Sequence, residues 1–128
     1  MVGILIVAHE TLGESLIRCA SHVLGKRPPH LACVGITGQD DPEQVLPRLR
    51  ELVRQLDQGG GVLILADICG ATPCNIARRL AVPGKVACLS GINLPMLVRA
   101  LTYRNEPLAA VMEKAISGGR AGVMAMNG

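Results

Sequence analysis

The feature that most constrains the fold is a nearly unbroken apolar run at the start of the chain. Residues Val2–Ala8 read VGILIVA, without alternation of polar and apolar positions. Such a run is typical of a strand that helices cover on both sides, because both faces of the strand must then be apolar. His9 follows directly, and apolar residues then recur at helical spacing from Leu12 until Gly25. The sequence therefore opens with a buried strand followed by a helix.

The same alternation continues to the end of the chain. Further strands are predicted at Leu31–Ile36, Val62–Ala66, Lys85–Leu89 and, short and last, Ala121–Met126. Four further helices are predicted. Two begin at cap-plus-proline pairs, Asp41-Pro42 and Thr72-Pro73, and the second of these runs to about Leu80. A third begins at Gly91-Ile92-Asn93-Leu94-Pro95, and a fourth runs from about Leu108 to Ser117, where Gly118-Gly119 ends it. Thr72 is expected to cap its helix, as Asp41 caps the one before. This pattern predicts one α/β domain over residues 1–128, a doubly wound, open and mostly parallel sheet with helices on both faces.

Composition excludes several classes of function. Hydrophobic residues make up 49% of the chain, but Tyr103 is the only aromatic residue, which argues against nucleic-acid binding because bases usually stack on aromatic rings. The net charge of +3 indicates at most a weak preference for acidic partners. The five cysteines are odd in number and form no CxxC pair, as expected of free thiols in a reducing cytoplasm. The first apolar run is too short for a signal peptide or a membrane span, so we expect a cytoplasmic protein.

Nothing in the sequence predicts a metal or a cofactor. Cys69 and Cys74 flank a candidate site at a spacing that suits no common zinc pattern. The chain has neither GxGxxG nor GxxxxGK[ST], which argues against a nucleotide-binding enzyme. A receiver domain phosphorylated on aspartate is rejected, because the first strand ends in His9 and Lys85 begins a strand instead of following one.

Chemically useful residues follow three of the predicted strands. His9 follows the first, Asp67 the third, and Ser90-Gly91-Ile92-Asn93 the fourth. In open α/β sheets, ligands bind beyond the carboxyl ends of the strands, where the strand order reverses. If the first and third strands are neighbours, Asp67 can hold one ring nitrogen of His9 while the other nitrogen attacks a phosphoryl group.

The loop after Asp67 supplies the other parts of a phosphoryl site. Thr72 offers a hydroxyl and free backbone N–H groups at a helix start, and Gly70 and Ala71 leave the approach open to a partner protein. Phosphoryl transfer needs mostly positioning and charge stabilisation. Each feature also has a purely structural interpretation: the histidine is satisfied within the fold, the aspartate caps the turn, and Thr-Pro caps the helix. The functional interpretation depends on all three reaching one edge of the sheet.

Three blocks of the chain resemble a known family. They are Gly3–His9 (GILIVAH), Leu65–Asn75 (LADICGATPCN) and Gly91–Leu97 (GINLPML), and together they resemble the mannose-type IIA domains of the bacterial sugar phosphotransferase system. The resemblance implies phosphorylation of His9, with Asp67 holding its ring, Thr72 and nearby amides holding the phosphoryl oxygens, and Asn93 shaping the adjacent loop. It also implies four parallel strands plus an antiparallel edge strand, Ala121–Met126, exchanged in a homodimer.

The resemblance implies partners too. The phosphoryl donor would be the histidine-containing carrier protein HPr, and the acceptor a IIB component that passes the group to a sugar at the membrane, so membrane contact would be indirect. The protein would be a protein-histidine phosphotransferase without a cofactor. A purely regulatory role, as a reporter of phosphorylation state to another protein, is equally compatible with the sequence.

Two positions depart from the family pattern. Many members have Gly after the histidine, where this chain has Glu10, and commonly Gly-Gly before Ser/Thr-Pro, where it has Gly70-Ala71. Glu10 places a negative charge near the incoming group, and Ala71 is unfavourable only if its φ is positive. Two alternatives stay open: the phosphotransfer subunit of dihydroxyacetone kinase, and an interaction module whose histidine no longer turns over.

Overall fold

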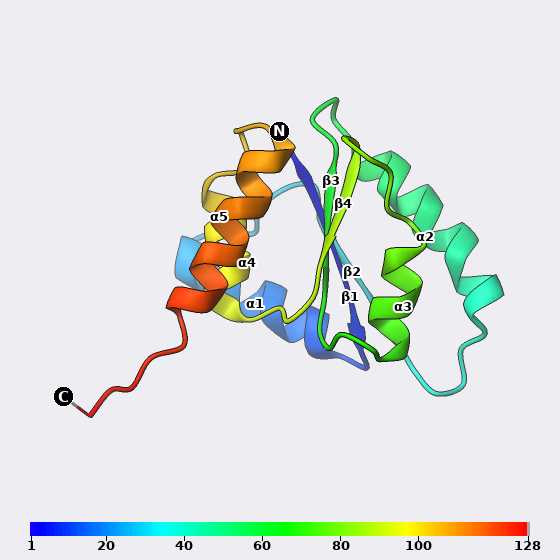
Figure 1. Ribbon diagram of the computed structural model, residues 1–128, viewed down its shortest axis with the longest axis horizontal. Coiled ribbons are helices and arrows are strands. Elements are labelled where there is room, and N and C mark those ends of the chain that lie inside the picture. The colour runs from blue at the N-terminus through cyan, green and yellow to red at the C-terminus, as the bar shows by residue number, and fades with distance from the viewer. Residues whose placement is uncertain (128) are drawn as a thin grey trace.

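Four strands form one all-parallel sheet in the computed structural model, which describes residues 1–127 (Figure 1). The strands are β1 (Gly3–His9), β2 (Leu31–Ile36), β3 (Val62–Ala66) and β4 (Val86–Leu89). Their order is β2-β1-β3-β4, and each neighbouring pair is parallel. The chain moves from β1 to one side and then returns to the other, so the strand order reverses between β1 and β3. The carboxyl ends of these two strands therefore meet where such sheets bind ligands.

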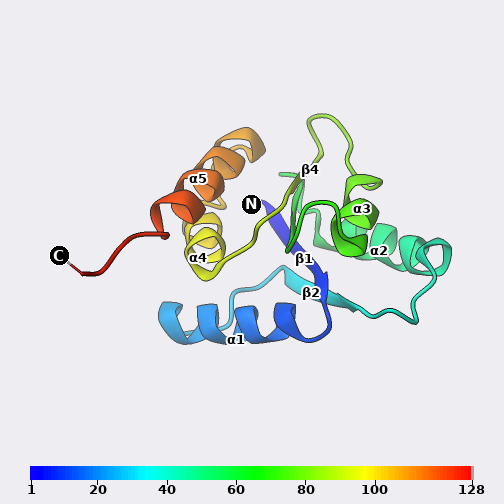
Figure 2. The same cartoon turned by 60° about the horizontal axis from the view of Figure 1, so that its bottom comes forward.

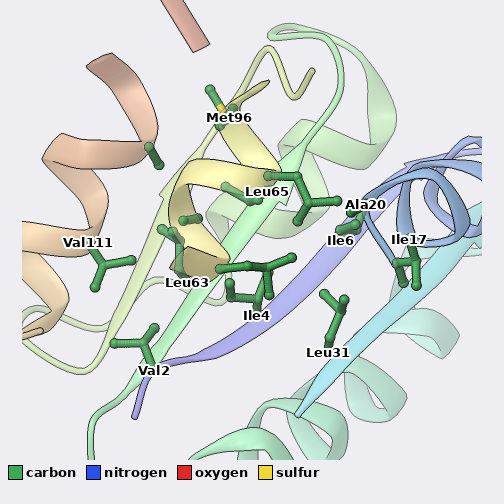
Figure 3. Close-up of a cluster of buried hydrophobic side chains, with 14 of the residues drawn as sticks. Val2, Ile4, Ile6, Ile17, Ala20, Leu31, Leu63, Leu65, Met96 and Val111 are labelled. Atoms are coloured by element: carbon green, nitrogen blue, oxygen red, sulfur yellow. The ribbon is translucent and has the colours of Figure 1, made fainter. Parts of the chain in front are cut away.

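Helices cover both faces of this sheet, as the apolar strands predict (Figures 1 and 2). One face carries α1 (Leu12–Leu24), α4 (Leu94–Thr102) and α5 (Leu108–Ala121), and the other carries α2 (Pro42–Leu56) and α3 (Thr72–Arg78). Side chains of β1 alternate between the two cores: Ile4 and Ile6 face α1 and α4, whereas Leu5 and Val7 lie in the core under α2 and α3. Figure 3 shows the first of these cores.

Local signals place most element boundaries where the sequence predicts them. Gly25 ends α1 in the left-handed conformation, with φ of 82°. The side chain of Asp41 accepts a hydrogen bond from the N–H of Glu43 and caps α2. The strands β2 and β3 have the predicted bounds. The differences elsewhere are small: β1 extends to His9, β4 begins at Val86, and α3 ends at Arg78.

The prediction that Gly118-Gly119 ends the last helix is wrong. Helix α5 continues through both glycines to Ala121. A Cβ atom on Gly118 would lie 2.6 Å from Cβ of Arg99, and one on Gly119 would lie 3.0 Å from Cε of Met96. The two glycines thus allow α5 to pack closely on α4, and this packing outweighs a helix penalty of about 1 kcal/mol per glycine.

The predicted final strand, Ala121–Met126, is not formed in the single chain. Ala121 is the last residue of α5, and residues 122–127 form no strand in the described part of the chain; they extend away from the sheet (Figure 1). A strand needs a neighbouring strand for its backbone N–H and C=O groups, and among residues 1–127 this segment has no such neighbour. Within the part of the chain that the structure describes, the sheet has four parallel strands and no antiparallel edge strand.

No helix within residues 1–127 has both the length and the apolar character that a membrane-spanning helix requires.

Candidate phosphoryl-acceptor site

The ring of His9 and the carboxylate of Asp67 are in direct contact at the carboxyl edge of the sheet. His9 is the last residue of β1 and Asp67 follows β3, its neighbour. Oδ2 of Asp67 lies 2.7 Å from Nδ1 of His9, and it also accepts the backbone N–H of His9 at 2.8 Å. An ionised carboxylate only accepts hydrogen bonds, so Nδ1 carries the proton. Nε2 of the neutral ring therefore keeps its lone pair and is the nitrogen free to react.

Asp67 is held rigidly and stays ionised. Its side chain is 7% exposed, and Oδ1 accepts the N–H of Ile68 at 2.8 Å. Burial by itself raises the pKa of this carboxyl, but hydrogen bonds from the backbone and ring of His9 and from the Ile68 N–H lower the pKa below its usual value overall. The carbonyl of Asp67 also accepts the N–H of Gly91 at 2.8 Å, which ties the loop after β4 to this site.

The His9 ring remains open on its other side. Its side chain is 48% exposed, in contrast to the buried carboxylate behind it. The neighbouring Ile68 is 62% exposed and Leu12 is 42% exposed. A reactive nitrogen in this setting is accessible to a residue on the surface of another protein.

The loop between Asp67 and α3 has the backbone geometry that its sequence predicts, but the helix after it begins one residue earlier than predicted. Gly70 has φ of 89°, a region that favours glycine. Ala71 has φ of −90°, so alanine is unstrained there and the departure from Gly-Gly has no conformational cost. Ala71, and not Thr72, is the N-cap residue of α3, and within residues 1–127 no side chain caps this helix. The predicted cap was one residue out because Pro73 is tolerated at the second position of a helix as well as at the first.

Asn93 has a structural task in this fold. Its Oδ1 accepts the N–H of Met96 at 2.9 Å, which caps α4, and its Nδ2 donates to the carbonyl of Gly119 in α5 at 3.0 Å. Both polar atoms of this side chain are therefore engaged. Asn93 shapes the loop after β4, whose Gly91 N–H reaches Asp67.

Glu10 adopts an unusual backbone conformation. Its φ is 49°, in the left-handed region, and its N–H donates to the carbonyl of Ile36 in β2 at 3.1 Å. A glutamate is disfavoured in this conformation, whereas glycine adopts it without a steric penalty. The Glu10 N–H thus bonds the turn after His9 to β2, whereas His9 itself bonds to Asp67, which follows β3.

Sequence reasoning missed the contribution of the backbone to this site. The N–H groups of His9 and Ile68 both donate to Asp67, and no pattern of side chains reveals such bonds. Within the described residues, no three His, Cys, Asp or Glu side chains gather as a metal site would require. The cysteines at positions 19, 33, 69, 74 and 88 are free thiols.

Comparison with known proteins reveals one consistent family. Residues 3–116 match the family described as "PTS system fructose IIA component". The mannose-specific EIIAB component of the phosphotransferase system from Escherichia coli K12 is 28% identical over 128 residues, covering 98% of this chain. The chain spans 39% of the length of that relative.

Two further similarities extend the comparison. The crystal structure of a phosphotransferase system component EIIA from Streptococcus agalactiae superposes with a TM-score of 0.86, at 25% identity, covering 98% of this chain and 97% of that one. The transcriptional regulatory protein LevR from Bacillus subtilis is 27% identical over 116 residues, which cover 88% of this chain and 12% of the regulator.

Proposed function

Because this chain belongs to the mannose-type IIA components of the phosphotransferase system, a family of phosphoryl carriers, we propose that it carries the phosphoryl group on Nε2 of His9. The observation that supports this most strongly is the contact between Nδ1 of His9 and the buried carboxylate of Asp67 at 2.7 Å. In the neutral ring this contact places the proton on Nδ1, so the lone pair of Nε2 is available, and the side chain is about half exposed.

The transfer requires only groups that the site and a partner supply. The Nε2 lone pair forms a bond to phosphorus as the bond between phosphorus and the donor residue breaks. The ring gains positive charge as the new bond forms, and the adjacent Asp67 carboxylate stabilises this charge. In the onward transfer the same bond breaks, and the ring returns to its neutral form with the proton still on Nδ1.

The phosphoryl oxygens need hydrogen-bond donors, and we assign these to the loop before α3. Thr72 would donate its hydroxyl and backbone N–H, with Gly70 and Ala71 allowing close approach. Asn93 would act indirectly, because its side chain already bonds to Met96 and Gly119. The family assignment points to HPr as donor and a IIB component as acceptor.

A regulatory acceptor is the second candidate function. The similarity over 116 residues to the transcriptional regulatory protein LevR supports it, since a domain of this kind lies within a protein of that description. In this role the chain would report its phosphorylation state to another protein, and the chemistry at His9 would be the same.

The first experiment is phosphorylation of the purified protein by HPr, enzyme I and phosphoenolpyruvate, followed by intact mass measurement at neutral pH. We expect one added phosphoryl group on the wild type and none on His9→Ala. The matched control is His22→Ala, which changes an exposed histidine of α1. Wild-type protein without added mass, beside phosphorylated HPr, would exclude the carrier function.

The role of Asp67 is tested with Asp67→Asn in the same assay. The amide keeps the size of the side chain and removes its charge, so less of the developing charge on the ring is stabilised. We expect phosphorylation to slow at least about tenfold, equivalent to about 1.4 kcal/mol of transition-state stabilisation. An unchanged rate would show that the carboxylate only shapes the turn.

A further inference from the structure

Gly35 lies in edge strand β2, opposite Ala8 of β1 and one residue before the partner of His9. A Cβ atom at this position would overlap the carbonyl oxygen of Glu10 and would lie 3.1 Å from its carbonyl carbon. Both atoms belong to the backbone, so no side-chain rotation can relieve the overlap. The absence of a side chain at Gly35 is what lets the turn after His9 lie directly against β2.

Glu10, whose carbonyl lies against Gly35, directly follows His9, the proposed phosphoryl acceptor. The N–H of Glu10 donates to Ile36, next to Gly35, and the φ of 49° at Glu10 directs its carbonyl over the glycine. On the opposite side, both the N–H and the ring of His9 bond to Asp67. His9 is therefore fixed between two anchors, one on β3 and one on β2.

We propose that Gly35 is a positioning residue for phosphoryl transfer. By admitting the Glu10 carbonyl against β2, it sets the path of the chain after His9 and so the angle at which Nε2 faces a partner. This inference rests on the proposed role of His9 as the acceptor. In this role Gly35 acts through the Glu10 peptide.

The expected size of the effect follows from the sensitivity of transfer reactions to geometry. A side chain at position 35 must displace the Glu10 peptide, and a misplacement of about 1 Å in a reacting group costs up to about 100-fold in rate. We expect Gly35→Ala to be phosphorylated about 10- to 100-fold more slowly than the wild type. The matched control is Gly38→Ala: apart from its chain neighbours, no heavy atom of residues 1–127 comes within 4 Å of a Cβ there.

Two readouts separate positioning from a general loss of stability. The first is the ¹⁵N NMR spectrum of the His9 ring, which reports whether Nδ1 still carries the proton held by Asp67. The second is rescue by Glu10→Gly, because a glycine at position 10 can turn its carbonyl away from a methyl group at position 35. The rate of the double variant is compared with that of Glu10→Gly alone, since the latter also removes a charge.

The inference is supported if Gly35→Ala slows phosphorylation and alters the ring spectrum, while Gly38→Ala does neither and Glu10→Gly restores the rate. A Gly35→Ala protein with wild-type rate and ring spectrum would overturn it. If Gly35→Ala does not fold, a folded double variant supports the inference and an unfolded one overturns it. Failure of the wild type itself to accept a phosphoryl group would instead reject the function proposed for His9, and the ring spectrum would still test Gly35.

Discussion

At the scale of single residues, Asp67 connects the stability of the fold to the chemistry of the site. Its carboxylate is nearly buried, yet hydrogen bonds from His9 and Ile68 compensate for the loss of water. The same bonds set the ring orientation of His9 and fix which nitrogen is free. A buried charge that is this well bonded is costly to neutralise, and this gives the site a measurable pH dependence.

We expect Asp67 to contribute to stability mainly above its ordinary pKa. In the folded protein the pKa of the Asp67 carboxyl lies below its reference value of 3.8. Its contribution to stability is therefore complete above pH 3.8 and is lost as the pH falls through the lower pKa of the folded state. Asp67→Asn should thus be less stable than the wild type at neutral pH, and the difference should shrink as the pH falls below the reference pKa of 3.8. Urea unfolding at a series of pH values measures this. A difference that is constant with pH would contradict it.

At the scale of elements, the close contact of α4 and α5 shows how packing decides a boundary. Gly118 and Gly119 read as a helix end in the sequence, but they lie inside α5, against Arg99 and Met96 of α4. Asn93 joins the same two helices, because it caps α4 and donates to the Gly119 carbonyl. This pair of helices therefore supports the loop after β4, whose Gly91 N–H bonds to Asp67.

Gly118→Val tests this packing. The substituted Cβ would lie 2.6 Å from Cβ of Arg99, and overpacking of this kind costs about 1–3 kcal/mol even though valine is a better helix former than glycine. We expect a lower free energy of unfolding by that amount in urea. The control is Ala109→Val on the exposed side of α5, which should cost less than about 1 kcal/mol. A Gly118→Val protein that is as stable as the wild type, or more stable, would show that helix propensity and not the contact with α4 decides the outcome.

At the scale of the whole molecule, Arg104 joins three distant segments at the edge of the sheet opposite the site. Its side chain is 95% buried and donates to the carbonyls of Val2, Pro29 and His30 at 2.6–3.0 Å, and Val2 returns a backbone N–H to its carbonyl. Burial lowers the pKa of this guanidinium, which nonetheless remains charged. The residue after α4 is thereby attached to the start of β1 and to the connection entering β2.

Arg104→Met should destabilise the protein by about 2–4 kcal/mol, because it removes three hydrogen bonds from a charged donor, one of them to the buried carbonyl of Val2. Phosphorylation of the folded variant should keep the wild-type rate, since His9 lies at the other end of β1. Chemical denaturation and the phosphotransfer assay measure the two effects, with the exposed Arg120→Met as the control. If the folded variant were phosphorylated more slowly, by a factor that corresponds to its loss of unfolding free energy, the two edges of the sheet would be coupled.

Assembly is the other property of the whole molecule. Val123, Met124 and Met126 are 69–93% exposed in the single chain, and β4 is an edge strand of the sheet, with β3 as its neighbouring strand. We propose that the part of the predicted strand Ala121–Met126 that follows α5 adds to the sheet of a second copy, as the family resemblance implies. Sedimentation equilibrium should reveal a dimer for the full chain and a monomer for a chain ending at Gly122. A full chain that sediments as a monomer would reject this arrangement.

The sequence by itself determined the four strands of the sheet, most helix starts and the presence of helices on both faces, because these depend on local periodicity and on caps such as Asp41 and Gly25. It also indicated His9 and Asp67, since topology sends the ends of parallel strands to one edge. Tertiary structure alone decided the contact distance between them, the passage of α5 through Gly118-Gly119, and the close approach of Glu10 to Gly35. The physical reason is that these features depend on contacts between residues far apart in sequence, which leave no periodic pattern of side chains.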